Sequence, residues 1–260
     1  MSPKTPKVLI DHCTFVHGQT TRMVAIHQRL HWPNGESTTV KVTKLQGLRR
    51  GAGEGWLRDE VRSIRSIALA ARDGRIVAMR SFELGAELSR SRTGRRTILG
   101  DLWSGVDFEH APSPICRGAV MGGMSWQEVC SRQHQETFYL QLLKHYQSGT
   151  AEAIFADLPR TAYIVAQLSN LALLHEFSAI CDSVGRKRLG DGFHLWTALC
   201  AGLDYFVTTD GKFLRTVPIE YRNGDMSCQA LSPTELLEVL DLAPSDLPIA
   251  EGSVSSFAMA

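Results

Sequence analysis

The sequence lacks a long uninterrupted apolar segment of the kind that a membrane-spanning helix needs. The best apolar run, residues 161–174, is interrupted by Gln167, Ser169 and Asn170 and falls short of roughly 18 consecutive apolar residues. The apolar stretch near the N-terminus is too short for a secretory signal. We therefore expect a cytoplasmic protein that does not interact with a membrane.

The sequence also lacks the spacings that identify common zinc and redox sites. No C-x-x-C pair occurs, and the nine histidines form no H-E-x-x-H motif. These absences argue against a zinc ribbon, a dithiol redox motif and a zinc-protease helix. Because disulfide scaffolds are typical of small secreted chains, we expect reduced, mostly buried cysteines. The six cysteines lie at positions 13, 116, 130, 181, 200 and 228.

The chain has almost no net charge, with 28 Lys and Arg against 27 Asp and Glu. Its 260 residues, 43% hydrophobic and 21% charged, fit a globular protein with a substantial core. The balance is uneven, because residues 44–96 carry a net charge of +7 and the remainder −6. A nuclease would use such cations for phosphates and such carboxylates for metals. Arginines on a solvated helix face would give the same composition.

Hydrophobic periodicity predicts strands separated by helices. This order predicts an α/β fold with a mostly parallel sheet flanked by helices on both faces. Residues 249–260 are small and polar, which is typical of a loose tail. The expected strands are 8–10, 38–42, 76–79, 204–210 and 226–230, and the expected helices are 19–31, 56–71, 82–89, 126–147, 157–180, 191–201 and 234–241.

Carboxylates stand where several of these elements end or begin. Asp11 and Asp210 end expected strands, Glu87 follows a third strand, and Asp191 opens a helix. Because sites in parallel sheets form at the carboxyl ends of strands, we expect these acids to lie at one edge. Carboxylates brought together repel one another without a cation, and Mg²⁺ and Mn²⁺ prefer oxygen ligands. The pattern therefore predicts a divalent-cation site.

Each of these acids also has an ordinary structural interpretation. Asp191 can cap its helix, Asp11 and Asp210 can form turns, and Glu87 can be a solvated helix residue. Glu83 competes with Glu87, because it lies one turn earlier on the same helix.

Aromatic and basic residues give a weaker indication of nucleic-acid binding. The basic strip formed by Arg90, Arg92, Arg95 and Arg96 can contact phosphates or be an exposed loop, and both interpretations stay open. The tryptophans are too dispersed to predict a base-stacking platform; those considered are Trp56, Trp103, Trp126 and Trp196.

A long stretch, Asp191 to Leu214 (DGFHLWTALCAGLDYFVTTDGKFL), closely resembles the C-terminal motif of the PIN domain family. It has an Asp at a helix start, a His three residues later, an Ala-rich helix, an apolar strand, and T-x-D followed by Phe. The opening strand into Asp11, with Cys13 two residues on, resembles the family's first motif. Ser81, followed six residues later by Glu87-Leu88, resembles its second acidic motif. LSPTELLEVL, with Ser232 as N-cap, resembles the last strand and helix.

This resemblance covers about residues 8–16, 76–88 and 155–241 and leaves residues 89–150 as an insertion. It implies a single PIN-like domain over residues 1–248 that acts as a ribonuclease with Mg²⁺ or Mn²⁺. By residue, it implies metal ligation and catalysis by the four acids, with Thr208 orienting a ligand or water. His194 matches as well, but its place between apolar residues is more typical of a packed structural histidine. The implied metal ligands are Asp11, Glu87, Asp191 and Asp210.

Two other hypotheses share this fold. A PIN-fold module that binds RNA or protein without cleaving would tolerate loss of the acids, so their retention argues against it. The toxin of a toxin–antitoxin pair would share the chemistry and would have a protein antitoxin or regulator as partner. The RNA target, the role of residues 89–150 and the choice between a monomer and a homodimer stay open.

Overall fold

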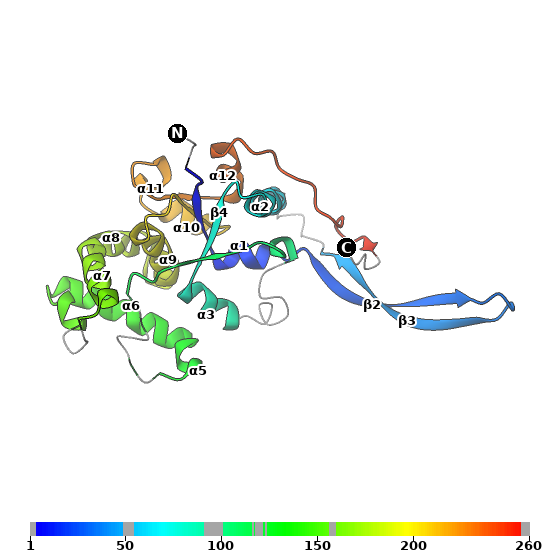
Figure 1. Cartoon of the computed structure of the whole chain (residues 1–260), viewed down its shortest axis with the longest axis horizontal. Helices are drawn as coiled ribbons and strands as arrows, with labels where there is room; N and C mark the ends of the chain where they lie inside the picture. Colours follow the sequence, from blue (N-terminus) through cyan, green and yellow to red (C-terminus); the bar gives the residue numbers. More distant parts are fainter. Residues whose placement is uncertain are drawn as a thin grey trace.

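The computed structural model describes residues 4–48, 55–90, 101–115, 117, 122, 124–155 and 160–255 (Figure 1). Strands are interspersed with helices in the first and last parts of the described chain, and a run of helices lies between Trp126 and Cys200. The strands are β1 (Lys7–Ile10), β2 (Thr21–His31), β3 (Ser37–Gly47), β4 (Val77–Ser81), β5 (Glu109–Ala111), β6 (Tyr205–Val207), β7 (Gln229–Leu231) and β8 (Val254–Ser255). The α-helices are α1 (His12–His17), α2 (Gly55–Arg72), α3 (Phe82–Arg90), α5 (Trp126–Val129), α6 (Arg132–Gln147), α7 (Ala162–Asn170), α8 (Leu174–Val184), α9 (Leu189–Cys200), α10 (Gly211–Thr216), α11 (Glu220–Asn223) and α12 (Pro233–Val239).

A five-stranded sheet forms the centre of the protein, in the order β5-β4-β1-β6-β7. All four pairings in this sheet are parallel. The register pairs Leu9 with Met79 on one side and with Phe206 on the other. The α/β fold with a mostly parallel sheet, predicted from the sequence, is therefore confirmed.

Helices cover this sheet on both faces, and each face has its own buried cluster. Successive strand residues point to opposite faces, so Leu9 and Phe206 belong to one cluster and Val8 and Val207 to the other. The first cluster packs on α6, α8 and α9, and the second packs on α2 and α12 (Figure 1). Burial on both faces explains why the inner strands β1 and β6 are almost wholly apolar.

The largest difference from the sequence prediction is at residues 19–31, where we expected a helix. These residues form β2, which pairs antiparallel with β3 over its whole length and extends from the body of the protein (Figure 1). The apolar side chains of Val24, Ile26 and Leu30 alternate with exposed residues, which is the period of a strand. The helix prediction was wrong because the alternation of apolar and exposed positions was missed among the many basic and polar residues of this segment.

We expect the outer part of this hairpin to be dispensable for folding. Removing residues 25–43 and joining Val24 to Lys44, which are cross-strand partners, through Asn-Gly keeps a hairpin turn at its base. The removed side chains belong to neither buried cluster, so the melting temperature should fall by no more than about 2 °C. Differential scanning calorimetry tests this, and a shortened chain that no longer folds would contradict it.

Residues 89–150, expected as an insertion, are partly integrated into the main fold. β5 extends the central sheet beside β4, and Phe138 and Tyr139 of α6 are buried in the first cluster. The helix expected at 126–147 is interrupted, because Ser131 precedes a new helix that begins at Arg132. The helix expected at 157–180 is likewise divided into α7 and α8.

The C-terminal residues do not form the loose tail that we expected from 249 onward. β8 pairs with β3, and the Gly47 amide donates to the Ser253 carbonyl at 3.0 Å. Residues 256–260 lie outside the described part of the chain. The tail was misjudged because its pairing partner is distant in sequence.

One segment of the described residues, Ala162–Val184, is long and apolar enough by length and composition to cross a membrane. Its mean hydropathy is 1.3, and one-third of it is buried in the protein. A core helix of a soluble protein passes the same test, so this single segment is weak evidence for a membrane span. The described residues thus do not indicate a protein with several membrane spans.

The five cysteines that the structure describes are free, and Cys116 lies outside the described residues. Cys181 and Cys228 are buried, and the other three are half-buried. The expectation of reduced cysteines agrees with this arrangement for the residues described.

Candidate acidic site

Three neighbouring strands bring acidic residues to the carboxyl edge of the sheet. Asp11 directly follows β1, which lies between β4 and β6. Asp210 follows β6, and α3, which carries Glu87, begins directly after β4. The order of strands therefore places three of the expected acids at one edge.

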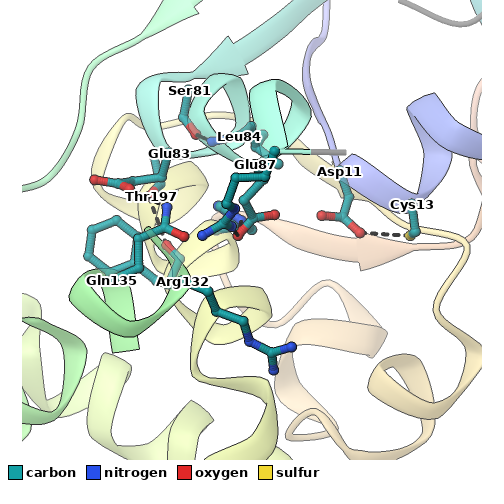
Figure 2. Close-up of polar contacts among 12 residues, drawn as sticks. Asp11, Cys13, Ser81, Glu83, Leu84, Glu87, Arg132, Gln135 and Thr197 are labelled. Carbon is teal, nitrogen blue, oxygen red and sulfur yellow. Dashed lines mark hydrogen bonds and ion pairs between the residues drawn. The ribbon is translucent and has the colours of Figure 1, made fainter. Parts of the chain in front are cut away.

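Asp11 is held in a fixed position by two side chains, and Figure 2 shows the contact with one of them, Cys13. Its Oδ2 accepts hydrogen bonds from the Thr208 hydroxyl and from the Cys13 thiol, both at 2.8 Å. Asp11 is only 3% exposed. Burial, and then the charge of Asp11, raise the pKa of Cys13 well above its usual value, so this residue stays a thiol donor. Thr208, which the resemblance implied would orient a ligand or water, donates to Asp11, one of the implied metal ligands.

Asp210 has a capping role besides its place at the site. Its Oδ1 accepts from the backbone amides of Lys212 at 2.8 Å and Phe213 at 3.0 Å, which caps α10. The Thr208 hydroxyl accepts from the Asp210 amide at 3.0 Å and so links Asp210 to Asp11. Arg188 Nε lies 3.6 Å from Asp210 Oδ2. The turn-forming interpretation of Asp210 is therefore confirmed, and its role as a metal ligand stays a prediction.

The structure distinguishes Glu83 from Glu87, which the sequence left as alternatives. Glu83 is fully buried, forms an ion pair with Arg117 at 3.0 Å and accepts from Gln135 at 2.6 Å. Figure 2 shows Glu83 pointing toward Gln135, whereas Glu87 points to the side where Asp11 lies. Glu83 is therefore a structural residue, and Glu87 is the acid of α3 at the site.

His194 is fully buried, as expected of a packed histidine, but it also contacts the site. Its Nε2 lies 3.2 Å from Glu87 Oε1. Burial lowers the pKa of His194, but the neighbouring carboxylates, Glu87 foremost, outweigh it and raise the pKa to about 9. Burial likewise disfavours the charged form of Glu87, but the His194 charge prevails and lowers its pKa. The two side chains therefore form a charged pair that positions Glu87.

Asp191 interacts electrostatically with all three other acids. It lies in the first turn of α9, which begins at Leu189 rather than at residue 191, so Asp191 is not the N-cap. Burial raises its pKa to about 7, and the charges of Asp11, Glu87 and Asp210 add to this effect. The structure thus brings the four predicted acids near one another, and their repulsion is incompletely offset by the chain's own cations.

Two clefts open onto this group of acids. The first, of about 490 Å³, is lined by Glu87 and Asp191. The second, of about 550 Å³, is lined by Asp210 and Cys13. We expected a divalent-cation site formed by the four acids, whereas the structure distributes three of them between these two clefts.

Basic side chains surround the first cleft, and most of them were not singled out from the sequence. The Arg132 side chain is 74% exposed, against 17% for the Glu87 side chain, so cations lie nearer to solvent than this carboxylate. These cations come from separate segments, which is why no local motif indicated them. The basic residues that line the cleft are Arg90, Arg132, Lys187 and Arg188.

The predicted basic strip can be placed only at its first residue. Arg90 lines the cleft, and its Nη2 lies 3.6 Å from Glu87 Oε1. Arg92, Arg95 and Arg96 lie outside the described residues. His12 was missed by the sequence analysis, although it lines this cleft and its positive form would lower the pKa of Glu87.

The donor chemistry of the site fits a hard divalent cation. Its oxygens are carboxylates, and burial, followed by the charge of Asp11, raises the pKa of Asp191 to about 7. As placed, the described part of the chain contains no group of three or more His, Cys, Asp or Glu side chains that could hold a metal ion. Mg²⁺ is commonly bound through one or two carboxylates with water and phosphate completing its ligands, so pairs of these acids fit.

Comparison with known proteins provides no relative for this chain. No protein-family model, curated protein or solved structure matches it. The likeness to PIN domains therefore rests on the sequence motifs and is compatible with the arrangement of strands, helices and acids described above.

Proposed function

We propose that the protein is a metal-dependent ribonuclease of PIN type that hydrolyses RNA phosphodiester bonds with Mg²⁺ or Mn²⁺. The observation that carries this proposal is a cleft lined by Glu87 and Asp191 together with four Arg and Lys side chains. Carboxylates suit a divalent cation, and the surrounding basic residues suit the phosphates of a nucleic acid. A cation site does not need basic residues around it, and a phosphate-binding surface does not need carboxylates. Both occur in one cleft when a bound cation acts on the phosphates of a nucleic acid.

Different residues of the chain would hold the cation, position its ligands and bind the phosphates. Glu87 and Asp191 would hold the cation, with Asp11 and Asp210 contributing negative charge beside them. His194 positions Glu87, and Thr208 positions Asp11. The basic residues of the cleft would bind the phosphates on either side of the scissile bond. When bound, the divalent cation supplies an acidified water and offsets charge on the phosphate oxygens.

A digestion of several RNA classes tests this proposal. The purified chain should cleave RNA with Mn²⁺, stop when EDTA is added, and lose cleavage by orders of magnitude in Asp210→Asn. Asn keeps the cap, because its side-chain oxygen can still accept from the Lys212 and Phe213 amides. Cleavage that resists both EDTA and the substitution would refute the proposal.

Thermal unfolding separately tests the metal. Mn²⁺ should stabilise the wild type by about 2.7 kcal/mol when its free concentration is about 100 times Kd. Asp210→Asn should gain less, because it has lost one of the charges that attract the cation. Differential scanning fluorimetry with and without Mn²⁺ measures both shifts, and equal shifts for the two proteins would exclude Asp210 from the cation site.

A second candidate is a PIN-fold module that binds RNA or protein without cleaving it. Two observations favour it: Glu87 has His194 as an internal cation partner, and Asp210 has Arg188. Such pairs would neutralise acids that no longer bind metal. RNA binding without cleavage at any Mn²⁺ concentration would support this candidate. The toxin hypothesis is a separate one, and an antitoxin encoded by a neighbouring reading frame would support it.

A further inference from the structure

The second cleft combines features that the proposed cleavage chemistry does not use. Trp56, in the first turn of α2, lines it and is 51% exposed. Lys212 and Arg215 of α10 line the same cleft, as does Asp210. The cleft therefore combines an exposed aromatic face, on which a base can stack, with two cations that can contact phosphates.

The indole and a guanidinium approach the same glycine. A Cβ atom added at Gly211 would lie 3.3 Å from Arg215 Nη1 and 3.9 Å from Trp56 Cη2. Gly211 therefore leaves space between the two groups that any other residue would begin to fill. The cleft, at about 550 Å³, lies within the size range of small-ligand sites.

This cleft is adjacent to the acidic site. Asp210 lines this cleft, and its Oδ2 lies 3.6 Å from Nε of Arg188, which lines the first cleft. Cys13, also in the cleft lining, donates to Asp11. A strand of nucleic acid bound at the acids could therefore continue into this cleft.

We propose that the Trp56 cleft is a subsite for single-stranded RNA, in which one base stacks on the Trp56 indole and the adjoining phosphates contact Lys212 and Arg215. The proposal rests on the proposed function for the identity of the polymer. Stacking on an aromatic side chain requires an unpaired base, because the faces of bases in a duplex are already covered. The subsite therefore selects single strands over duplexes without reading sequence.

Binding measured in EDTA tests the subsite apart from cleavage. The probe is a fluorescein-labelled oligouridine of about 12 nucleotides, followed by fluorescence anisotropy. Trp56→Ala should weaken binding about 5- to 150-fold, and Trp56→Phe should keep most of the affinity. Trp126→Ala is the matched control, because Trp126 is 59% exposed and does not line this cleft, and it should bind as the wild type does.

Two further probes separate stacking from charge. An abasic strand of the same length should bind the wild type and Trp56→Ala equally. Arg215→Gln and Lys212→Gln should each flatten the salt dependence by about 0.7 in logarithmic slope. Unchanged oligouridine binding in Trp56→Ala, or an equal loss on duplex RNA, would overturn the subsite. A chain that passes these tests but never cleaves RNA would instead refute the nuclease while leaving the subsite in place.

Discussion

Asp191→Asn is expected to lower RNA cleavage by orders of magnitude while the protein becomes no less stable in EDTA. The variant loses a charge that would help to hold the divalent cation, and the hydrolytic step depends on that cation. Asn has nearly the same volume as Asp, so the first turn of α9 should be preserved. Cleavage assays with Mn²⁺ and calorimetric melting in EDTA, on both proteins, measure the two effects.

The stability gain of Asp191→Asn should depend on pH in a defined direction. Burial and the nearby carboxylates raise the pKa of Asp191 from 3.8 to about 7, so the folded wild type binds a proton that the unfolded chain releases. Wild-type stability should therefore fall as pH rises through this window. The gain should be absent at pH values below 3.8 and on the order of 4 kcal/mol at pH values above about 7. A variant that is less stable than wild type at pH 8 would show that Asp191 is structural.

Glu83→Gln is expected to destabilise the protein by about 3–5 kcal/mol, because it leaves the buried Arg117 guanidinium without its counter-charge. Both side chains are at most 1% exposed, so water cannot replace the lost carboxylate. Urea unfolding measures the change in the free energy of unfolding. Replacing both partners by apolar residues, as Glu83→Leu with Arg117→Met, should restore part of the loss.

Glu87→Gln is the matched control, since it makes the same chemical change one turn later on α3. Its stability loss should be smaller, because the Glu87 side chain is 17% exposed and its partner His194 can release a proton. Its cleavage of RNA should fall far more than its stability. If Glu83→Gln were fully stable but unable to cleave RNA, Glu83 would be the acid at the site and Glu87 the structural residue.

The elements that the sequence predicted well are those whose signals are local. β1 and β6 are short apolar runs that end at Asp11 and near Asp210, and both were expected. The capping box at Ser232 and Glu235 also forms as expected, with the Glu235 amide donating to the Ser232 hydroxyl at 3.3 Å. Local patterns suffice in these places because strand ends and helix caps are determined by adjacent residues.

The features that the sequence missed depend on contacts between distant residues. Glu83 could not be distinguished from Glu87, because its partner Arg117 lies 34 residues later in a segment without a recognisable pattern. β2 was mistaken for a helix because its alternation of apolar and exposed residues is weak, and pairing with β3 stabilises the strand. Trp56 was dismissed as isolated, whereas the fold brings it beside Arg215. Such partners follow from the tertiary fold, which no local pattern specifies.

Manganese binding followed by electron paramagnetic resonance tests the central claim most directly. The claim is that the acids at the carboxyl edge of the sheet bind a divalent cation. Adding wild-type protein to Mn²⁺ should decrease the signal of the free ion, and Asp191→Asn should leave most of that signal in place. A wild type that leaves the free-ion signal unchanged, or a variant that removes it equally well, would contradict the account.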